Sequence, residues 1–128
     1  VVVSTPQRVA VGVANKAVSM FGKLNVPVLG LLENMSYYAC PHCNERDDVF
    51  GHGGARQAAE EMRLPFLGEI PLNSSLSRAS EAGSPVVISH PDSAPARALR
   101  RATQLLAGRL SVAAVAGYEA LYDNLLPE

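Results

Sequence analysis

Apolar runs of strand length alternate along this chain with segments of helical periodicity. The runs lie at residues 1–4, 26–32 and 65–70, with a fourth at residues 86–88. Elsewhere, apolar positions recur at spacings of three and four residues, which predicts helices. The expected helices span residues 9–24, 55–62, 76–82 and 94–110. Because strands alternate with helices, we expect an α/β fold whose parallel sheet carries helices on both faces.

Two of the predicted helices have a defined apolar face. The first has one made of Val9, Val13, Ala17, Met20, Phe21 and Leu24, and the last has an inner face of Leu99, Ala102, Leu106 and Leu110. Beyond Ser111 the composition shifts to Ala, Val and Gly. We therefore divide the chain into a domain portion, residues 1–110, and a C-terminal extension, residues 111–128, to which we assign no element.

The loops that follow the predicted strands are the first places to look for a ligand. In parallel sheets, ligands bind beyond the carboxyl ends of the strands, here after Val3, Leu32 and Ile70. The polar stretch from residue 33 to 54 is about twenty residues long, and loops of that length in compact domains are usually functional or disordered. The strand-end loops, and this one above all, are expected to carry the site.

A Cys-x-x-Cys motif, Cys40-Pro41-His42-Cys43, lies in this polar stretch. Such a turn holds two thiolates at a spacing that suits one soft metal centre, a Zn²⁺ ion or an iron–sulfur cluster. Two ligands are half a site, since structural zinc and cubane clusters usually take four. Either a second copy of the chain supplies the other pair, or His52 completes the set locally.

Other interpretations of the motif stay open at this point. Thiol–disulfide oxidoreductases use the same spacing at a helix N-terminus, but the glycines and acidic residues that follow here favour no helix. The two cysteines could also be an incidental surface pair. The nearby turn at residues 50–54 resembles a glycine-rich phosphate cradle, although a turn that starts a helix explains it equally well.

Composition and charge exclude several classes of partner. The formal net charge is −1, which argues against general electrostatic binding to nucleic acid or to an anionic membrane. The apolar runs are too short to span a bilayer. A close pair of cysteines is typical of a reducing compartment. We expect a cytoplasmic protein, with the mitochondrial matrix as the alternative.

The ordered motifs of the chain resemble the Mrp/ApbC family of deviant P-loop ATPases, which are similar to MinD and ParA. The matching segments include the Ser-Thr-Pro-Gln at residues 4–7, Glu-Asn-Met-Ser-Tyr at 33–37, the cysteine motif at 40–43, Phe-Gly-His-Gly-Gly-Ala at 50–55 and Phe-Leu-Gly-Glu-Ile-Pro-Leu at 66–72. The match covers residues 1 to about 110. The resemblance predicts the C-terminal part of a P-loop NTPase-like fold.

The resemblance also implies a function. Members of the family are dimers that carry a [4Fe–4S] cluster and deliver it to apo-proteins. By this resemblance, Cys40 and Cys43 of each of two subunits would ligate a bridging cluster, which makes the expected partners a second copy and apo iron–sulfur client proteins. ATP would be the second ligand, with Asn34 against the adenine and the backbone of Pro71, Leu72 and Asn73 beside it.

The chain departs from the family pattern in ways that bear on ATP hydrolysis. It contains no G-x-x-x-x-G-K-[ST] sequence, and the family's Walker A loop and magnesium-binding acidic strand would lie upstream of Val1. Arg8 and Val13 stand where the family usually has aspartates. We therefore expect a portion of an ATPase that does not hydrolyse ATP by itself.

Overall fold

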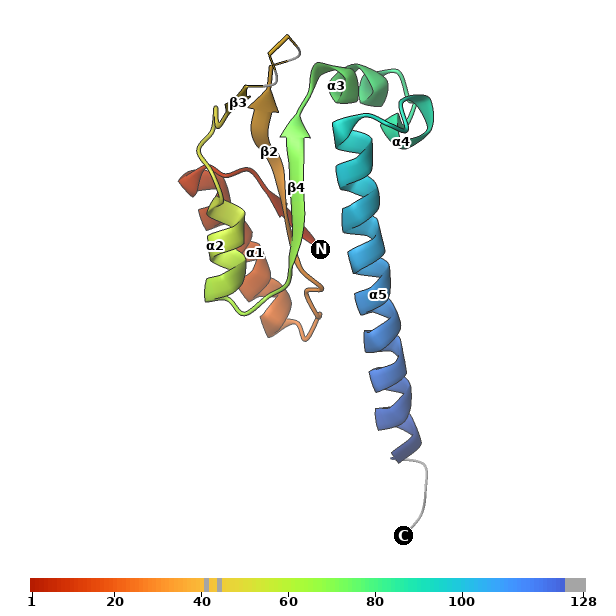
Figure 1. Cartoon of the computed structure of the whole chain (residues 1–128). Helices are drawn as coiled ribbons and strands as arrows, with labels where there is room; N and C mark the ends of the chain where they lie inside the picture. The colour runs from red at the N-terminus through yellow and green to blue at the C-terminus, as the bar shows by residue number, and fades with distance from the viewer. Residues whose placement is uncertain (41, 44, 124–128) are drawn as a thin grey trace.

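Three parallel strands and one short antiparallel strand form the sheet (Figure 1). The structure is a computed structural model that describes residues 1–40, 42, 43 and 45–123, with side chains up to residue 115. Strand β2 (Leu31–Ala39) pairs in parallel with β1 (Val2–Ser4) and with β4 (Phe66–Leu72). Strand β3 (Arg46–Asp47) runs antiparallel to the end of β2. Strand β2 is therefore the centre of the described sheet.

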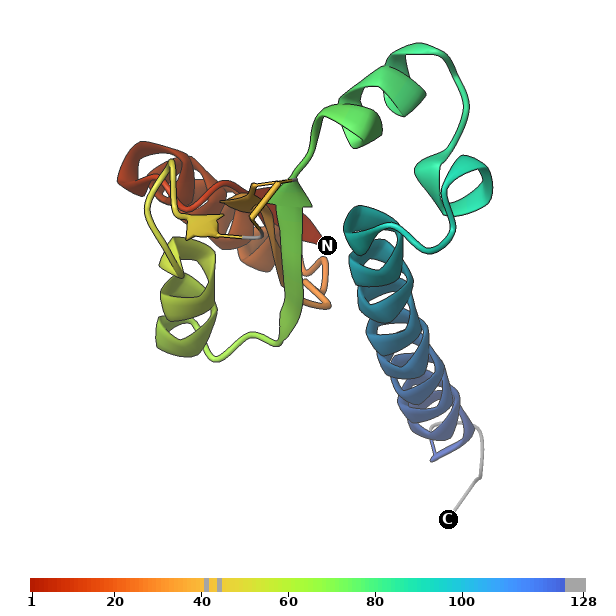
Figure 2. The same cartoon turned by 45° about the horizontal axis from the view of Figure 1, so that its top comes forward.

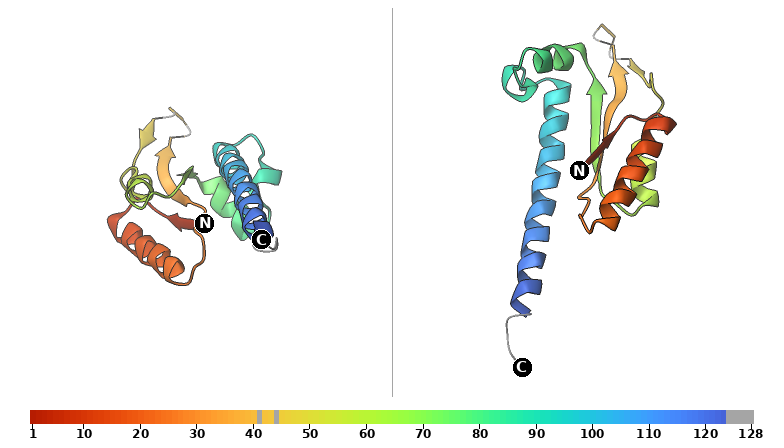
Figure 3. Two further views of the ribbon diagram at one scale, coloured as in Figure 1. Left: turned by 90° about the horizontal axis from the view of Figure 1, so that it is seen from below. Right: turned by 180° about the vertical axis from the view of Figure 1, so that it is seen from behind.

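Helices cover both faces of this sheet. Helices α1 (Arg8–Lys23) and α2 (Gly54–Glu61) lie on one side, and the long helix α5 (Ala94–Asp123) runs along β4 on the other (Figures 1 and 3). Helices α3 (Ser74–Glu81) and α4 (Val86–Ser89) lie at the end where β2 and β4 terminate (Figure 2). The predicted α/β class with helices on both faces is confirmed. Within the described part of the chain, no helix is long and apolar enough to cross a membrane.

Two apolar clusters hold these layers together. The larger one joins β1 and β2 to α1 and α2 through the buried side chains of Val2, Ala14, Leu31, Ala58 and Ala59. The smaller one joins α3, α4 and α5 through Ala79, Val86 and Ala96. The buried members of both clusters are mostly alanines, which let the helix backbones approach closely.

The predicted strand at residues 26–32 is wrong in its bounds. Residues 26–30 form no strand, and β2 begins at Leu31 and continues to Ala39. Much of the polar stretch that we expected to be loop is therefore strand. The physical reason is that Glu33 and Ser36 are fully buried and hydrogen-bond to each other, with 2.6 Å between Ser36 Oγ and Glu33 Oε1. Polar side chains that satisfy one another can enter a core without an apolar pattern.

The predicted apolar face of the first helix is wrong at most of its positions, although Phe21 does pack against the core. In α1 the buried residue is Ala14, and Val11, Val18 and Phe21 pack with it against the core. Val9 and Val13 are 83% and 63% exposed. The helix carries two stripes at spacings of three and four residues, and only packing against β1 and α2 selects between them.

Two further differences lie toward the C-terminus. The fourth apolar run, residues 86–88, belongs to the short helix α4 and not to a strand, because the Ile88 and Ser89 N–H groups bond back to the Pro85 carbonyl and Val86 packs with α3 and α5. Helix α5 starts at Ala94 as predicted but runs through the expected boundary at residue 110 to Asp123. The alanine-rich composition beyond Ser111 favours helix continuation. Residues 124–128 of the predicted extension lie outside the described residues.

Candidate functional site

The cysteine motif lies at the turn of the β2–β3 hairpin, at the carboxyl end of the central strand (Figures 1 and 2). The hairpin is paired at Tyr38 with Asp47 and at Ala39 with Arg46. A hydrogen bond of 2.9 Å from the Cys40 N–H to the Glu45 carbonyl closes the turn. The site is thus anchored on a strand rather than in a structureless loop, which fixes the position of the first cysteine relative to the sheet.

The turn stabilises a thiolate on Cys40. The backbone N–H groups of His42 and then of Cys43, together with the Cys43 side chain, hydrogen-bond to the Cys40 sulfur and lower the pKa of the Cys40 thiol. The thiolate is the form that binds metals and reacts as a nucleophile. Cys40 is half-buried and Cys43 is exposed, and neither forms a disulfide. Pro41, the remaining motif residue beside them, lies outside the described residues.

His52 does not complete a metal site with the two cysteines. Its Nδ1 atom lies 2.8 Å from Arg46 Nη2 and 3.9 Å from Asp48 Oδ2, so the ring belongs to a small polar cluster on the hairpin. Among the described residues, which include Cys40, Cys43 and His52, no three metal-ligating side chains come together. One copy of the chain therefore presents two sulfur ligands.

The arrangement differs from that of a thiol–disulfide oxidoreductase. In those enzymes a helix begins at the first cysteine and lowers its pKa. Here the strand β3 follows the turn, and the local backbone N–H groups supply the stabilisation instead. The structure does not favour the redox interpretation of the motif.

A buried carboxylate, Glu33, ties the hairpin strand to helix α2. Its Oε1 atom accepts the Ser36 hydroxyl at 2.6 Å, and its Oε2 atom accepts the Ala55 N–H at 2.7 Å. Ala55 is in the first turn of α2, where free N–H groups and the helix dipole favour a negative charge. Sequence reasoning missed this residue because Glu33 stands in a polar stretch that gave no sign of burial.

The glycine-rich turn before α2 is explained by packing. Gly53 has a φ of 69°, in the left-handed region, and a Cβ on Gly54 would overlap the Pro6 carbonyl oxygen. Because the Ala55 N–H is occupied by Glu33, this helix start has lost a donor that a phosphate would need. The phosphate-cradle interpretation of residues 50–54 is therefore not supported.

The four residues predicted to contact a nucleotide line one groove of about 460 Å³. Asn34 comes from β2, and Pro71, Leu72 and Asn73 come from the end of β4 and the start of α3. The remaining lining is mainly apolar and includes Val3, Leu32, Ile70, Leu76 and Leu99. The volume is in the range of small-molecule sites, and a mostly apolar wall with few polar groups is typical of them.

Local hydrogen bonds already engage the oxygens of both asparagines in this groove. Asn34 Oδ1 accepts the Met35 N–H at 3.0 Å, and Met35 has a φ of 55° that bends the strand at this point. Asn73 Oδ1 caps helix α3 by accepting the Ser75 N–H at 2.8 Å. The Asn73 side-chain oxygen is therefore a helix cap, which is compatible with the backbone contact expected of this residue.

The sheet order and the flanking helices define the class of protein to which the chain is similar, a P-loop NTPase-like α/β protein. The cell division ATPase MinD of Pyrococcus furiosus has the same fold over 82% of this chain and 40% of its own, with a TM-score of 0.65 and 20% identity. A nucleotide-binding protein from Archaeoglobus fulgidus, solved with ADP, matches 72% of this chain and 37% of its own, with a TM-score of 0.59 and 36% identity.

The chain belongs to the NUBPL iron-transfer P-loop NTPase family of ParA proteins, whose family model matches residues 1–107. The resemblance drawn from the sequence motifs is thereby confirmed. The iron-sulfur protein required for NADH dehydrogenase of Arabidopsis thaliana, named as mitochondrial, is 50% identical over 104 residues, which are 81% of this chain and 33% of that protein. The iron-sulfur cluster carrier protein of Deinococcus radiodurans is 46% identical over 112 residues, 88% of this chain and 31% of that protein. The chain thus spans about a third of the length of these relatives.

Proposed function

We propose that this chain is the cluster-holding part of an iron–sulfur cluster carrier. Its cargo is a [4Fe–4S] cluster, bound between two copies by Cys40 and Cys43 of each and delivered to apo-proteins. The observation that carries the proposal is the hairpin turn, which presents two sulfur ligands, one of them with a lowered pKa. Relatives named as cluster carriers and cluster transfer proteins support it.

Ligand number is the argument for two copies. A cubane cluster takes four cysteine ligands, and the described part of one chain brings together only two metal-binding side chains, both at a projecting turn. A symmetric pair of turns supplies four thiolates without any further residue. Because Cys43 is exposed, a receiving protein can approach the cluster at the tip of the hairpin.

A zinc ion between two copies is the second candidate. Four thiolates also satisfy tetrahedral zinc, so the geometry of the turn alone favours neither metal centre. The names of the relatives favour the cluster. The two candidates differ in sulfide content and colour, which makes them simple to separate.

The decisive experiment is anaerobic reconstitution of the full chain with iron and sulfide. We expect about two iron and two sulfide ions per chain, visible absorbance, and a doubling of the molar mass on cluster uptake. A Cys40→Ser/Cys43→Ser variant should lose all three. Stoichiometric zinc without sulfide in the purified protein would support the zinc alternative instead.

His52→Ala is the matched control, because it tests whether His52 acts as a metal ligand together with the cysteines of its own copy. Because His52 contacts Arg46 and Asp48 and not the cysteines, this variant should take up iron as the parent does. Cluster uptake that survives in the double cysteine variant would refute the proposal, whatever the control shows.

We further propose that the groove beside Asn34 holds the adenine of ATP. Its apolar walls fit a flat base, and the Asn34 amide can read a base edge. The triphosphate would need a cradle that these 128 residues do not contain, so the isolated chain should bind adenosine weakly and hydrolyse no ATP. Adenosine titration followed by NMR should shift the amides of Asn34 and Leu72 first. Equal shifts in an Asn34→Ala variant would contradict the assignment.

For the compartment, we propose the cytoplasm, with the mitochondrial matrix as the alternative. Both keep thiols reduced, as the free cysteines of the turn require.

A further inference from the structure

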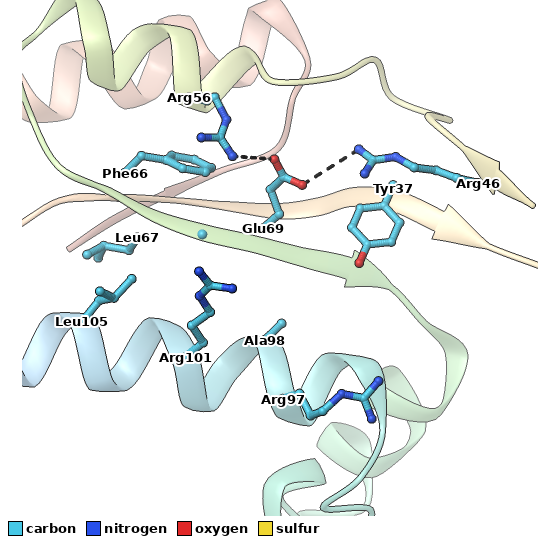
Figure 4. A pocket seen from close by; sticks show the side chains of 11 residues that line it. Tyr37, Arg46, Arg56, Phe66, Leu67, Glu69, Arg97, Ala98, Arg101 and Leu105 are labelled. Carbon is cyan, nitrogen blue, oxygen red and sulfur yellow. Dashed lines mark hydrogen bonds and ion pairs between the residues drawn. The ribbon is translucent and has the colours of Figure 1, made fainter. Parts of the chain in front are cut away.

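A second groove, of about 620 Å³, lies between strand β4 and helix α5, away from the nucleotide groove. Phe66, Leu67, Gly68 and Glu69 of β4 line it on one side, and α5 lines it on the other (Figure 4). Nothing lies within 4 Å of a Cβ placed on Gly68, so the strand is open to the groove at that residue. Neither the cluster nor the nucleotide assignment accounts for this groove.

The lining is strongly basic. It contains four arginines, namely Arg46, Arg56, Arg97 and Arg101, and a single carboxylate, Glu69. Arg56 and Arg46 approach Glu69 at 3.0 Å and 3.9 Å, so both of its oxygens are engaged (Figure 4). The Glu69 carboxylate is thus already paired, and the positive charges of the α5 arginines have no carboxylate partner in the groove.

Arg97 and Arg101 carry this excess charge. They stand four residues apart on α5, and neither forms an ion pair with any residue that the structure describes. The Arg97 guanidinium donates to the Asp92 carbonyl, and Arg101 points toward β4 (Figure 4). Like charges at this spacing repel each other on a helix, and a bound anion would relieve that repulsion.

The groove is continuous with the cysteine hairpin. Arg46 lies on β3, with its guanidinium 4.2 Å from the centre of the Tyr37 ring on β2, and both side chains line the groove. The same two strands lead directly into the turn that holds Cys40 and Cys43. A molecule seated in the groove is therefore held beside the cargo.

We propose that this groove docks an acidic segment of the apo-protein that receives the cluster. Guanidinium groups bind carboxylates through two parallel hydrogen bonds, and neither α5 arginine has a carboxylate partner among the described residues. The groove runs from Arg46 and Tyr37 of the hairpin, past the arginines of α5, to an apolar end at Leu67 and Leu105, a mixture that suits a peptide better than a small inorganic anion (Figure 4). The identity of the occupant as a client rests on the proposed carrier function.

The test is fluorescence anisotropy of the full chain with a labelled ten-residue peptide of glutamate and leucine. We expect saturable binding that weakens as salt rises, and no binding of the same peptide with glutamine in place of glutamate. An Arg97→Gln/Arg101→Gln variant should bind about tenfold more weakly or worse. The matched control is Arg100→Gln/Arg109→Gln, which removes the same charge from α5 outside the groove and should bind as the parent does.

Several results would overturn the proposal. One is the absence of saturable peptide binding at about 1 mM protein. Another is an Arg97→Gln/Arg101→Gln variant that binds the peptide as tightly as the parent does. A third is a control variant that loses as much affinity as the Arg97→Gln/Arg101→Gln variant, which would indicate general charge attraction. Displacement of the peptide by inorganic pyrophosphate at matched ionic strength would make the groove a small-anion site. Dimerisation abolished by the same variant would make it an interface between copies.

Iron counting on the same proteins separates this proposal from the carrier function. The arginine variant should take up cluster normally, and the Cys40→Ser/Cys43→Ser variant should still bind the peptide. Loss of cluster uptake without loss of peptide binding in the cysteine variant supports both proposals. Cluster uptake by the cysteine variant would refute the carrier function. The groove would then remain an acidic-peptide site, but its occupant would no longer be a cluster-receiving protein.

Discussion

Replacement of Glu33 tests the idea that one buried carboxylate fixes the cysteine hairpin to the rest of the fold. The Glu33 side chain is fully buried, and it accepts the Ala55 N–H and the Ser36 hydroxyl. Glu33→Ala would leave two buried donors without an acceptor, each worth about 1–3 kcal/mol, and would open a cavity. We expect a loss of about 3–5 kcal/mol, a large part of the stability of a small domain.

Glu33→Gln is the matched variant because it keeps the shape of the side chain. Its amide oxygen can accept the Ala55 N–H, and its NH₂ group can donate to the Ser36 hydroxyl, which also accepts. The negative charge at the start of α2 is lost, and the Ser36 hydroxyl hydrogen loses its carboxylate acceptor, so the expected cost is about 1–2 kcal/mol.

Urea unfolding of the full chain, followed by circular dichroism, measures both variants. The midpoints should fall in the order parent, Glu33→Gln, Glu33→Ala, with similar slopes. If Glu33→Ala were as stable as Glu33→Gln to within about 0.5 kcal/mol, the unsatisfied donors would not dominate and the reasoning would be refuted.

Three further predictions concern two glycines and the Cys40 thiol. Gly54→Ala should destabilise the chain by about 2 kcal/mol or more in urea unfolding, because its Cβ would overlap the Pro6 carbonyl oxygen. Gly12→Ala, in the interior of α1 with open space around it, should instead stabilise by about 0.5–1 kcal/mol, and a loss of stability there would show that α1 is packed differently. Alkylation by iodoacetamide as pH rises should begin at lower pH for Cys40 than for a free cysteine peptide, because hydrogen bonds lower the pKa of its thiol and so extend the thiolate form downward in pH. Cys43→Ala should move the alkylation profile partway toward the higher pH of a free cysteine, since the backbone donors persist. An unchanged profile would exclude a contribution of the Cys43 side chain to the lowered pKa of Cys40.

Local patterns in the sequence were sufficient for several elements. Asn73 caps α3 and Gly83, with a φ of 65°, follows its end, which is why the predicted helix at residues 76–82 is close to the observed one. The start of α5 was also predicted correctly, at a point where Ser93 Oγ accepts the Ala96 N–H at 3.4 Å. That the two cysteines lie close together was evident from their spacing alone, since a short turn requires no distant contact to bring them together.

Other features depend on contacts between segments far apart in the chain. Glu33 is polar in sequence, and its burial becomes favourable when the Ser36 hydroxyl and the N–H of Ala55, 22 residues away, satisfy its two oxygens, which lets β2 run on to Ala39. Because β2 is longer than its apolar pattern, the cysteines lie on a hairpin and not in a loop. The buried face of α1 was likewise selected by packing, because both of its apolar stripes have helical spacing.

The sequence by itself therefore determined the family, the close pair of cysteines and most of the helices, because these follow from short-range spacing. Tertiary structure decided which face of each helix is buried, how far the central strand extends, and where the hairpin stands. It also gathered Arg46, Arg56, Arg97 and Arg101 from three segments into one groove, an arrangement that no local pattern contains. Those properties depend on which distant groups meet, and the folded sheet brings them together.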